Sequence, residues 1–175
     1  MRINVDINKE YQAFEGIGAS GAWWAQLVGG WEHIDPTSKT PVRDRIAQLL
    51  YCPTEGIGMS IYRYNIGGGS VHSGKGEYSR PLRATQCFET APKMYDWGRD
   101  ANAVYMMKKA VEYGADEVVF FVNSPIERLT KNGLAHNKKH QLFHVLAHFA
   151  CRVVAGVALK MRQMLRNGLG EHIVR

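Results

Sequence analysis

The sequence predicts an α/β fold with a parallel sheet, on the evidence of three segments. Residues 58–66 and 117–124 are apolar, and their β-branched and aromatic side chains are typical of buried strands. Residues 100–113 lie between these strands and carry apolar side chains at helical spacing. Strand, helix and strand in this order form a βαβ unit, and a strand and helix before residue 58 add a second unit.

The N-terminal part begins with alternating apolar and polar side chains at residues 2–7, which predict a half-exposed strand. Residues 14–26 then form a short apolar strand that glycines interrupt, and Trp23 and Trp24 follow it directly. Adjacent tryptophans at this position can stack on a sugar ring or a base. They can equally fill the hydrophobic core, and the sequence leaves both interpretations open.

Two helices are predicted in the first 133 residues. Residues 29–40 contain the turn signals Gly-Gly-Trp and Asp-Pro and are expected to be a loop. A helix then begins with Pro41 in its first turn and runs to Leu50, with its apolar side chains on one face. The second helix, at residues 100–113, has Asp100 as its predicted N-cap.

The first of the two buried strands carries polar side chains near its end and runs into three glycines. Because side chains alternate along a strand, Ile61, Arg63 and Asn65 share one face. Polar residues at the carboxyl end of a parallel strand are typical of ligand sites, although a buried arginine paired with a core carboxylate gives the same pattern. The second strand ends similarly, with Asn123 and Ser124, and its continuous apolar character predicts burial on both faces.

Two motifs that can hold a phosphate or a metal ion are incomplete. Residues 67–98 are a long excursion rich in Gly, Ser and Pro, of a kind that is more often functional than idle. It contains GSVHSGKG at residues 69–76, which lacks the hydroxyl residue that a phosphate-binding loop places after its lysine. Four histidines are spaced four residues apart, but no acid or cysteine completes a zinc site with them: His136, His140, His144 and His148. We interpret these histidines as solvated or half-buried, and we predict no cofactor and no metal.

The composition changes sharply near residue 133. Residues 134–175 contain seven Lys and Arg, one acid and five of the seven histidines, so they carry the whole net charge of +6. Apolar side chains recur at helical spacing from about residue 140 to residue 165, which predicts a basic helix. We therefore divide the chain into residues 1–133 and a basic, His-rich tail, residues 134–175. A basic helix can rest on anionic lipid, but without aromatic interleaving or a base-reading motif we expect no specific nucleic-acid partner.

Targeting and redox signals are sparse. No run of 18 apolar residues occurs, so no transmembrane segment is predicted. The N-terminus lacks the apolar region of a signal peptide, and as written the chain is expected to stay in the cytoplasm. The cysteines Cys52, Cys87 and Cys151 fit no disulfide or zinc framework, and we interpret them as buried small residues or free thiols.

Four blocks within residues 5–133 carry a family resemblance. They are FEGIGASGAWWAQ at residues 14–26, SIYRYNIGGGS at residues 60–70, YDWGRD at residues 95–100, and NSP followed by TKNG between residues 123 and 133. In this order and spacing they resemble the N-terminal part of family 30 of the glycoside hydrolases, specifically its endo-β-1,6-galactanase-like members.

The resemblance implies a (β/α)8 TIM barrel with an attached β-sandwich to which the N-terminal strand contributes. It also implies retaining hydrolysis of a β-linked galactan or related oligosaccharide by two glutamates. Six residues would contact the sugar: Arg63 and Asn65 in the subsite, Trp23 and Trp24 in its wall, and Asn123 and Ser124 on the rim of the third strand. The fixed positive charge of Arg63 would keep a nucleophilic carboxylate ionised.

The chain departs from the family pattern where the catalytic residues are expected. The family's two glutamates lie at the ends of strands four and seven, whereas the matched part supplies about three βα units of a barrel that takes ~250 residues. Its Asn-Glu-Pro block does not occur after Gly133, and Glu15, Glu117 and Glu127 match no catalytic position. We therefore expect a truncated product, a partial barrel with an added C-terminal helix, that has no catalytic residue and is inactive alone.

The expected remnant leaves a strand edge and apolar faces uncovered, which predicts self-association. The alternative function is a non-catalytic fragment that binds carbohydrate through the rim, or an anionic partner through the tail. Members of the resembled family are often exported, so the resemblance leaves the localisation open.

Overall fold

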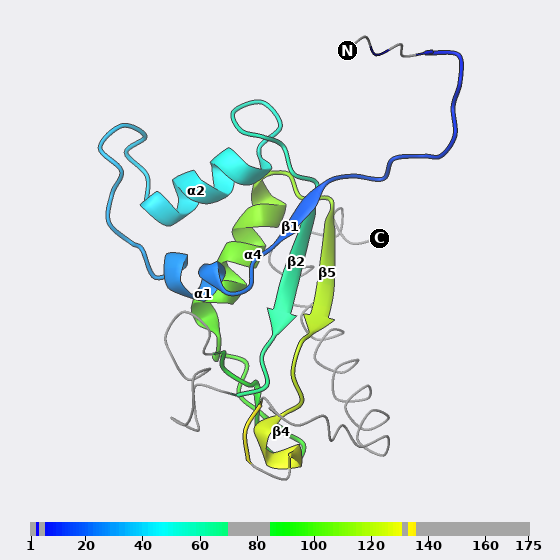
Figure 1. Cartoon of the computed structure of the whole chain (residues 1–175). Helices are drawn as coiled ribbons and strands as arrows, with labels where there is room; N and C mark the ends of the chain where they lie inside the picture. The colour runs from blue at the N-terminus through cyan, green and yellow to red at the C-terminus, as the bar shows by residue number, and fades with distance from the viewer. Residues whose placement is uncertain (1–2, 4–5, 70–84, 131–132, 136–175) are drawn as a thin grey trace.

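The computed structural model describes residues 3, 6–69, 85–130 and 133–135. Three parallel strands form a sheet in the order β1 (Gly18–Ser20), β2 (Ile61–Ile66) and β5 (Glu117–Val122). Helix α4 (Ala101–Tyr113) packs against this sheet, and α1 (Trp24–Val28) and α2 (Val42–Tyr51) pack against α4 on the same side (Figure 1). The predicted mixed α/β class with a parallel sheet is confirmed.

The register of the sheet fixes which side chains share a face. Arg63 lies opposite Ser20 on β1 and opposite Val119 on β5, and Asn65 lies opposite Phe121. Residues opposite one another in a sheet project to the same side, so these residues occupy one face of the sheet. Alternate residues project to the other face, toward the helices.

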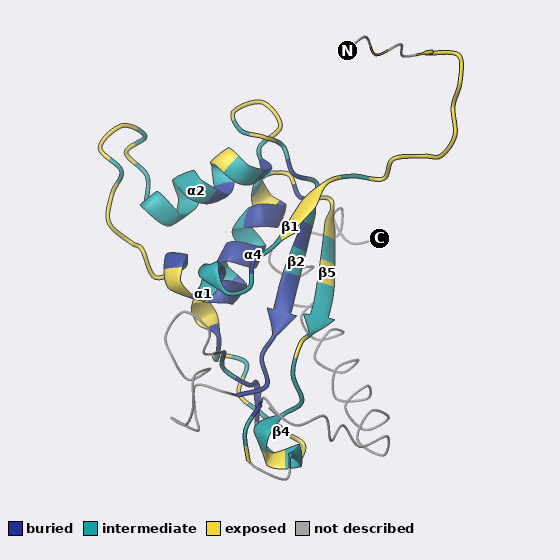
Figure 2. Cartoon of the chain, in the orientation of Figure 1, coloured by how far each residue is buried: buried dark blue, intermediate teal, exposed yellow. Residues whose placement is uncertain are grey.

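The core lies between the helices and the even-numbered side chains of β2. Tyr62 is 0% exposed, and Tyr64 and Ile66 are also buried (Figure 2). The buried residues of α4 complete this cluster: Ala103, Val104, Met106, Met107, Ala110 and Val111. The alternation predicted for β2 is therefore confirmed, with Arg63 on the face away from this core.

One expectation about β5 is wrong. The strand was expected to be buried on both faces, but Val119 is 39% exposed and only Val118, Phe120 and Val122 pack against the core. In the part of the chain that the structure describes, β5 has a strand neighbour on one side only, β2, and no helix lies on the face of Val119. Apolar residues on both faces of a strand thus do not ensure that both faces are covered.

The expected N-terminal strand falls mostly on residues outside the described part. The described residues of that segment, Ile3, Asp6 and Ile7, are exposed and are not in a strand. The chain turns after them, because the Lys9 amide donates to the Asp6 carbonyl at 3.2 Å. A contribution of this segment to a β-sandwich stays a prediction.

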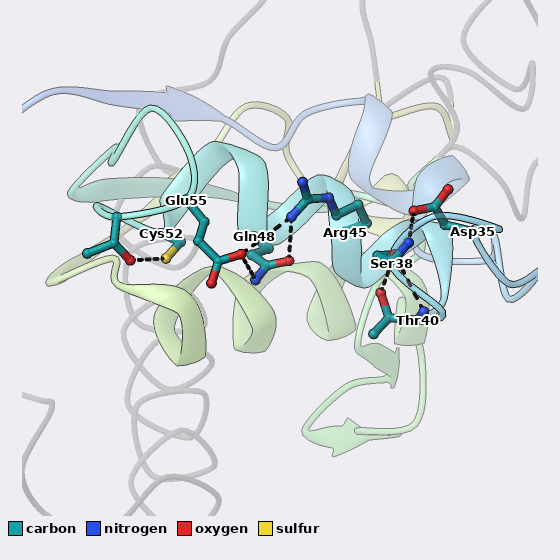
Figure 3. A network of polar contacts seen from close by, with 8 residues as sticks. Asp35, Ser38, Thr40, Arg45, Gln48, Cys52 and Glu55 are labelled. Atoms are coloured by element: carbon teal, nitrogen blue, oxygen red, sulfur yellow. Dashed lines mark hydrogen bonds and ion pairs between the residues drawn. The ribbon is translucent and has the colours of Figure 1, made fainter.

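Polar contacts hold α2 in place. The Asp44 carboxylate of α2 accepts a hydrogen bond from the Tyr105 hydroxyl at 2.6 Å and lies 3.7 Å from the Lys109 ammonium, so both contacts join α2 to α4. On the outer side, Gln48 links Arg45 to Glu55 through two hydrogen bonds of 2.9 Å (Figure 3). This outer network stabilises the helix layer and lies away from the carboxyl ends of the strands.

The excursion after β2 contains a hairpin of β3 (Glu89–Ala91) and β4 (Met94–Tyr95). Residues 70–84, which include most of the GSVHSGKG motif, lie outside the described part, as do the predicted helix at 140–165 and its histidines. The division at residue 133 and self-association also stay predictions.

Cys52 and Cys87 are free thiols. Among the described residues, no group of three or more His, Cys, Asp or Glu is arranged to hold a metal ion. None of the described helices is long and apolar enough to cross a bilayer.

Candidate functional site

Arg63 occupies the sheet face opposite the helices, near the carboxyl end of β2. Its guanidinium lies over the ring of Phe121 on the neighbouring strand, with Cζ 3.4 Å from the ring centroid. Within the described residues this side chain makes no ion pair and no hydrogen bond. Among the described residues, Arg63 is therefore not a core arginine paired with a carboxylate. A stacked guanidinium keeps its N–H donors at its edge, where they can bind hydroxyl groups.

Asn65 lies beside Arg63 on this face, one residue from the end of β2. It is 8% exposed, and its Oδ1 is buried and has no hydrogen-bond partner among the described residues. A buried acceptor without a partner costs about 1–3 kcal/mol, so an isolated one calls for an explanation. The sequence analysis expects Asn65 to lie near a ligand. Its unpaired Oδ1 is an acceptor that a donor group of such a ligand could satisfy.

The loops after β2 and β5 are in backbone contact. The amide of Glu127 donates to the carbonyl of Gly68 at 2.9 Å. A Cβ on Gly68 would lie 2.4 Å from the Pro125 carbonyl oxygen, and a Cβ on Gly67 would lie 2.2 Å from that of Gln86. Only glycine fits such approaches, so Gly67 and Gly68 allow the backbone segments to lie this close together.

The two tryptophans follow β1 at the same edge of the sheet. Trp24 begins α1, donates from Nε1 to the Ser20 carbonyl at 2.8 Å and packs against the hydrophobic core. Trp23 is half-buried. The packing of Trp24 agrees with the core-filling interpretation for that residue, and the role of both side chains in a sugar-binding wall stays a prediction.

Asn123 and Ser124 follow the last residue of β5, as expected. Asn123 is exposed and Ser124 is half-buried. Because the three strands are parallel, their carboxyl ends meet at one edge, and the structure brings Arg63 and Asn65 to the edge at which these residues lie.

An ion pair with a buried carboxylate, which the sequence analysis missed, fixes the hairpin to the loop after β5. Arg128 of the 3₁₀ helix η2 (Glu127–Leu129) donates to both Glu89 carboxylate oxygens, from Nη2 at 2.6 Å and from Nε at 3.2 Å. The Glu89 side chain is 1% exposed, and it also accepts the Lys93 amide at 3.1 Å. No periodic signal marks either residue, because Glu89 begins a strand of three residues and Arg128 lies in a 3₁₀ helix of three residues, far apart in the chain.

Asp100 has a different role from the one predicted for it. It stands at the N-terminus of α4 with a left-handed backbone, φ 54°, and makes no side-chain capping hydrogen bond. Its Oδ2 instead accepts a hydrogen bond from the Tyr64 hydroxyl of β2 at 2.5 Å. Burial raises the pKa of Asp100 to about 7, and the hydrogen bond from Tyr64 acts in the opposite direction.

Comparison with known proteins identifies a family and a curated relative. The family model described as O-Glycosyl hydrolase family 30 matches residues 1–163. An endo-beta-1,6-galactanase of Hypocrea rufa is 26% identical over 152 residues, which cover 74% of this chain and 29% of the galactanase.

Two solved structures are also similar. A conserved exported protein from Bacteroides fragilis has a TM-score of 0.78 at 24% identity, over 91% of this chain and 34% of that protein. The catalytic domain of GH30 xylanase C from Talaromyces cellulolyticus has a TM-score of 0.47 at 23% identity, over 70% of this chain and 25% of that domain. The first likeness shows a shared fold. The chain thus spans about a third or less of the length of these three proteins.

Proposed function

Since the chain belongs to O-glycosyl hydrolase family 30, we propose that its three parallel strands are the first strands of a (β/α)8 barrel that binds a β-linked galactan. The galactanase of Hypocrea rufa supports the choice of galactan as the substrate class. In such a barrel the sheet face of Arg63 is the inner face and the helices cover the outer face, as they do for the described strands.

The observation that carries the proposal is the pair of unsatisfied polar groups at the carboxyl end of β2. The guanidinium of Arg63 is held on Phe121 with its donors free of described partners, and the Asn65 Oδ1 beside it is a buried acceptor without one. A sugar hydroxyl group both donates and accepts, so sugar hydroxyl groups can satisfy both side chains.

We assign the remaining residues around this pair. Asn123 and Ser124 would form polar contacts on the rim, and Trp23 with Trp24 would close the wall after β1. Arg63 would also hold a neighbouring carboxylate in its ionised form, because an opposite charge lowers the pKa of a carboxyl group.

Hydrolysis requires two carboxyl groups about 5 Å apart across the scissile bond. The described acids near the sheet do not supply such a pair in this proposal. Glu117 begins β5 at its amino end, and Glu89 is bound by Arg128. We propose that the chain binds the sugar and that cleavage depends on carboxylates that the family carries on later strands.

Isothermal titration of the full chain with a β-1,6-linked galacto-oligosaccharide tests the proposal. The variant Arg63→Met should weaken binding about tenfold or more, which corresponds to ~1.4 kcal/mol. Arg43→Met is the matched control, because Arg43 also stacks on an aromatic ring, that of Tyr105 at 3.9 Å, but lies in the helix layer. It should bind as the parent chain does.

Two outcomes would contradict the proposal. Equal losses in both arginine variants, with both folded by circular dichroism, would show that Arg63 has no specific role in sugar binding. Unchanged binding in Arg63→Met would remove Arg63 from the site. Adding salt should change the affinity little, because hydroxyl recognition involves no net charge, whereas an anionic partner held by the basic tail would be released.

A further inference from the structure

A buried network joins the strand that carries the site to the start of α4. Tyr64 stands between Arg63 and Asn65 in the sequence, and its side chain points to the opposite face of the sheet. Its hydroxyl group donates to Asp100 Oδ2 at 2.5 Å. Both side chains are deeply buried, Tyr64 at 1% and Asp100 at 5% exposed, so water has little access to the pair.

A second arm of the network reaches the loop after β2. The Asp100 amide donates to the side-chain oxygen of Gln86. The Gln86 carbonyl in turn lies so close to Gly67 that a Cβ there would be 2.2 Å from it. Since Gly67 is two residues beyond Asn65, Asp100 connects to the end of β2 by two routes, the hydrogen bond from Tyr64 and the close approach of Gln86 to Gly67.

No described cation pairs with the Asp100 carboxyl group, so its negative charge would be uncompensated when it ionises. The titratable groups that face it from β2 are Tyr64 and, farther away, Tyr62. On its own side, Arg99 lies 3.5 Å from Asp96 and donates to the Cys87 carbonyl at 3.2 Å. No ion pair between Asp100 and a described Lys, Arg or His is present. Burial keeps the pKa of Tyr64 well above its ordinary value, so its phenol stays protonated.

We propose that Asp100 is a positioning residue that makes sugar binding at the end of β2 depend on its own protonation. This inference rests on the proposed sugar-binding function. With Asp100 protonated, the Tyr64, Asp100 and Gln86 contacts hold β2 and its glycine loop as the structure shows them. When Asp100 is ionised, its buried carboxylate has no cation partner and is poorly solvated. Movement of the Gln86 loop lets water reach the carboxylate and lowers this cost. That movement displaces Gly67 and, with it, Asn65.

The first test needs no sugar. Backbone amide chemical shifts of Gly67 and Asn65 in the full chain are followed from about pH 5 to about pH 9, a range that brackets the ionisation of Asp100. We expect both signals to titrate near the pKa of about 7. Asp100→Asn should abolish this titration, and the exposed Asp116→Asn should leave it intact. Tyr64→Phe removes a hydrogen bond that lowers the pKa, so the midpoint should move to higher pH.

The second test measures affinity for the β-1,6-linked galacto-oligosaccharide over the same range. Binding should weaken about fivefold or more above the midpoint in the parent chain, and it should be independent of pH in Asp100→Asn. Amide signals that do not titrate, or that still titrate in Asp100→Asn, overturn the inference. If Asp100→Asn does not fold, an unmoved midpoint in Tyr64→Phe overturns it. If the amide signals of Gly67 and Asn65 change with pH but the chain binds no sugar, the proposed function and the coupling to sugar are overturned. The effect of Asp100 on the end of β2 is then retained.

Discussion

Replacing Arg128 with methionine should destabilise the fold strongly, because it leaves the Glu89 carboxylate buried without its cation. The Glu89 side chain is 1% exposed and loses both bonds from the guanidinium, at 2.6 and 3.2 Å. Only the Lys93 amide, at 3.1 Å, then remains as a donor among the described contacts of Glu89. Breaking a buried pair from one side costs about 3–5 kcal/mol. The Arg128 side chain is 30% exposed, so we expect the lower end, about 3 kcal/mol.

Urea denaturation of the full chain measures this effect, followed by circular dichroism. The double variant Glu89→Gln with Arg128→Met should lose less stability than Arg128→Met alone, because a neutral glutamine leaves no unpaired charge buried. Glu32→Gln is the matched control, since Glu32 pairs with Arg43 at 3.0 Å but is 75% exposed, and such pairs contribute ~0–1 kcal/mol. A loss below about 1 kcal/mol in Arg128→Met, or a double variant at least as unstable as Arg128→Met, would refute the reasoning.

Three further predictions concern stability, and all are measured by urea denaturation. The free energy of unfolding should fall by up to ~4 kcal/mol as the pH rises from about 4 to about 7, because folded Asp100 keeps a proton that the unfolded chain has released. Asp100→Asn should remove most of this fall, and an unchanged pH profile in that variant would contradict it. Gly67→Ala should destabilise by about 1–3 kcal/mol through its contact with the Gln86 carbonyl, whereas Gly98→Ala, whose Cβ would be 3.2 Å from the nearest atom, should not. Met107→Ala, at a core position 1% exposed, should cost about 2–5 kcal/mol, and a neutral result would be inconsistent with the core described.

Local patterns in the sequence predict the elements of the fold well. The alternation through Arg63 and Asn65 identifies β2 and the face on which we propose the site. These features depend on residues that are adjacent in the chain, so the sequence contains the whole signal.

Features that depend on distant partners are not predictable in this way. Asp100 has the spacing of an N-cap, but the buried Tyr64, 36 residues away, takes its carboxylate. Glu89 and Arg128 are 39 residues apart, in a short strand and a short 3₁₀ helix, so no period relates them. The exposure of Val119 depends on which elements cover β5, and the apolar composition of a strand does not specify that.

Mapping of amide chemical shifts by NMR during titration with a β-1,6-linked galacto-oligosaccharide tests the central claim most directly. The account predicts that the largest changes occur at Arg63, Asn65 and Asn123, at the carboxyl ends of β2 and β5, and that the signals of α2 do not change. Changes confined to α2, or no change at the ends of these strands at saturating sugar, would contradict a sugar site on this edge of the sheet.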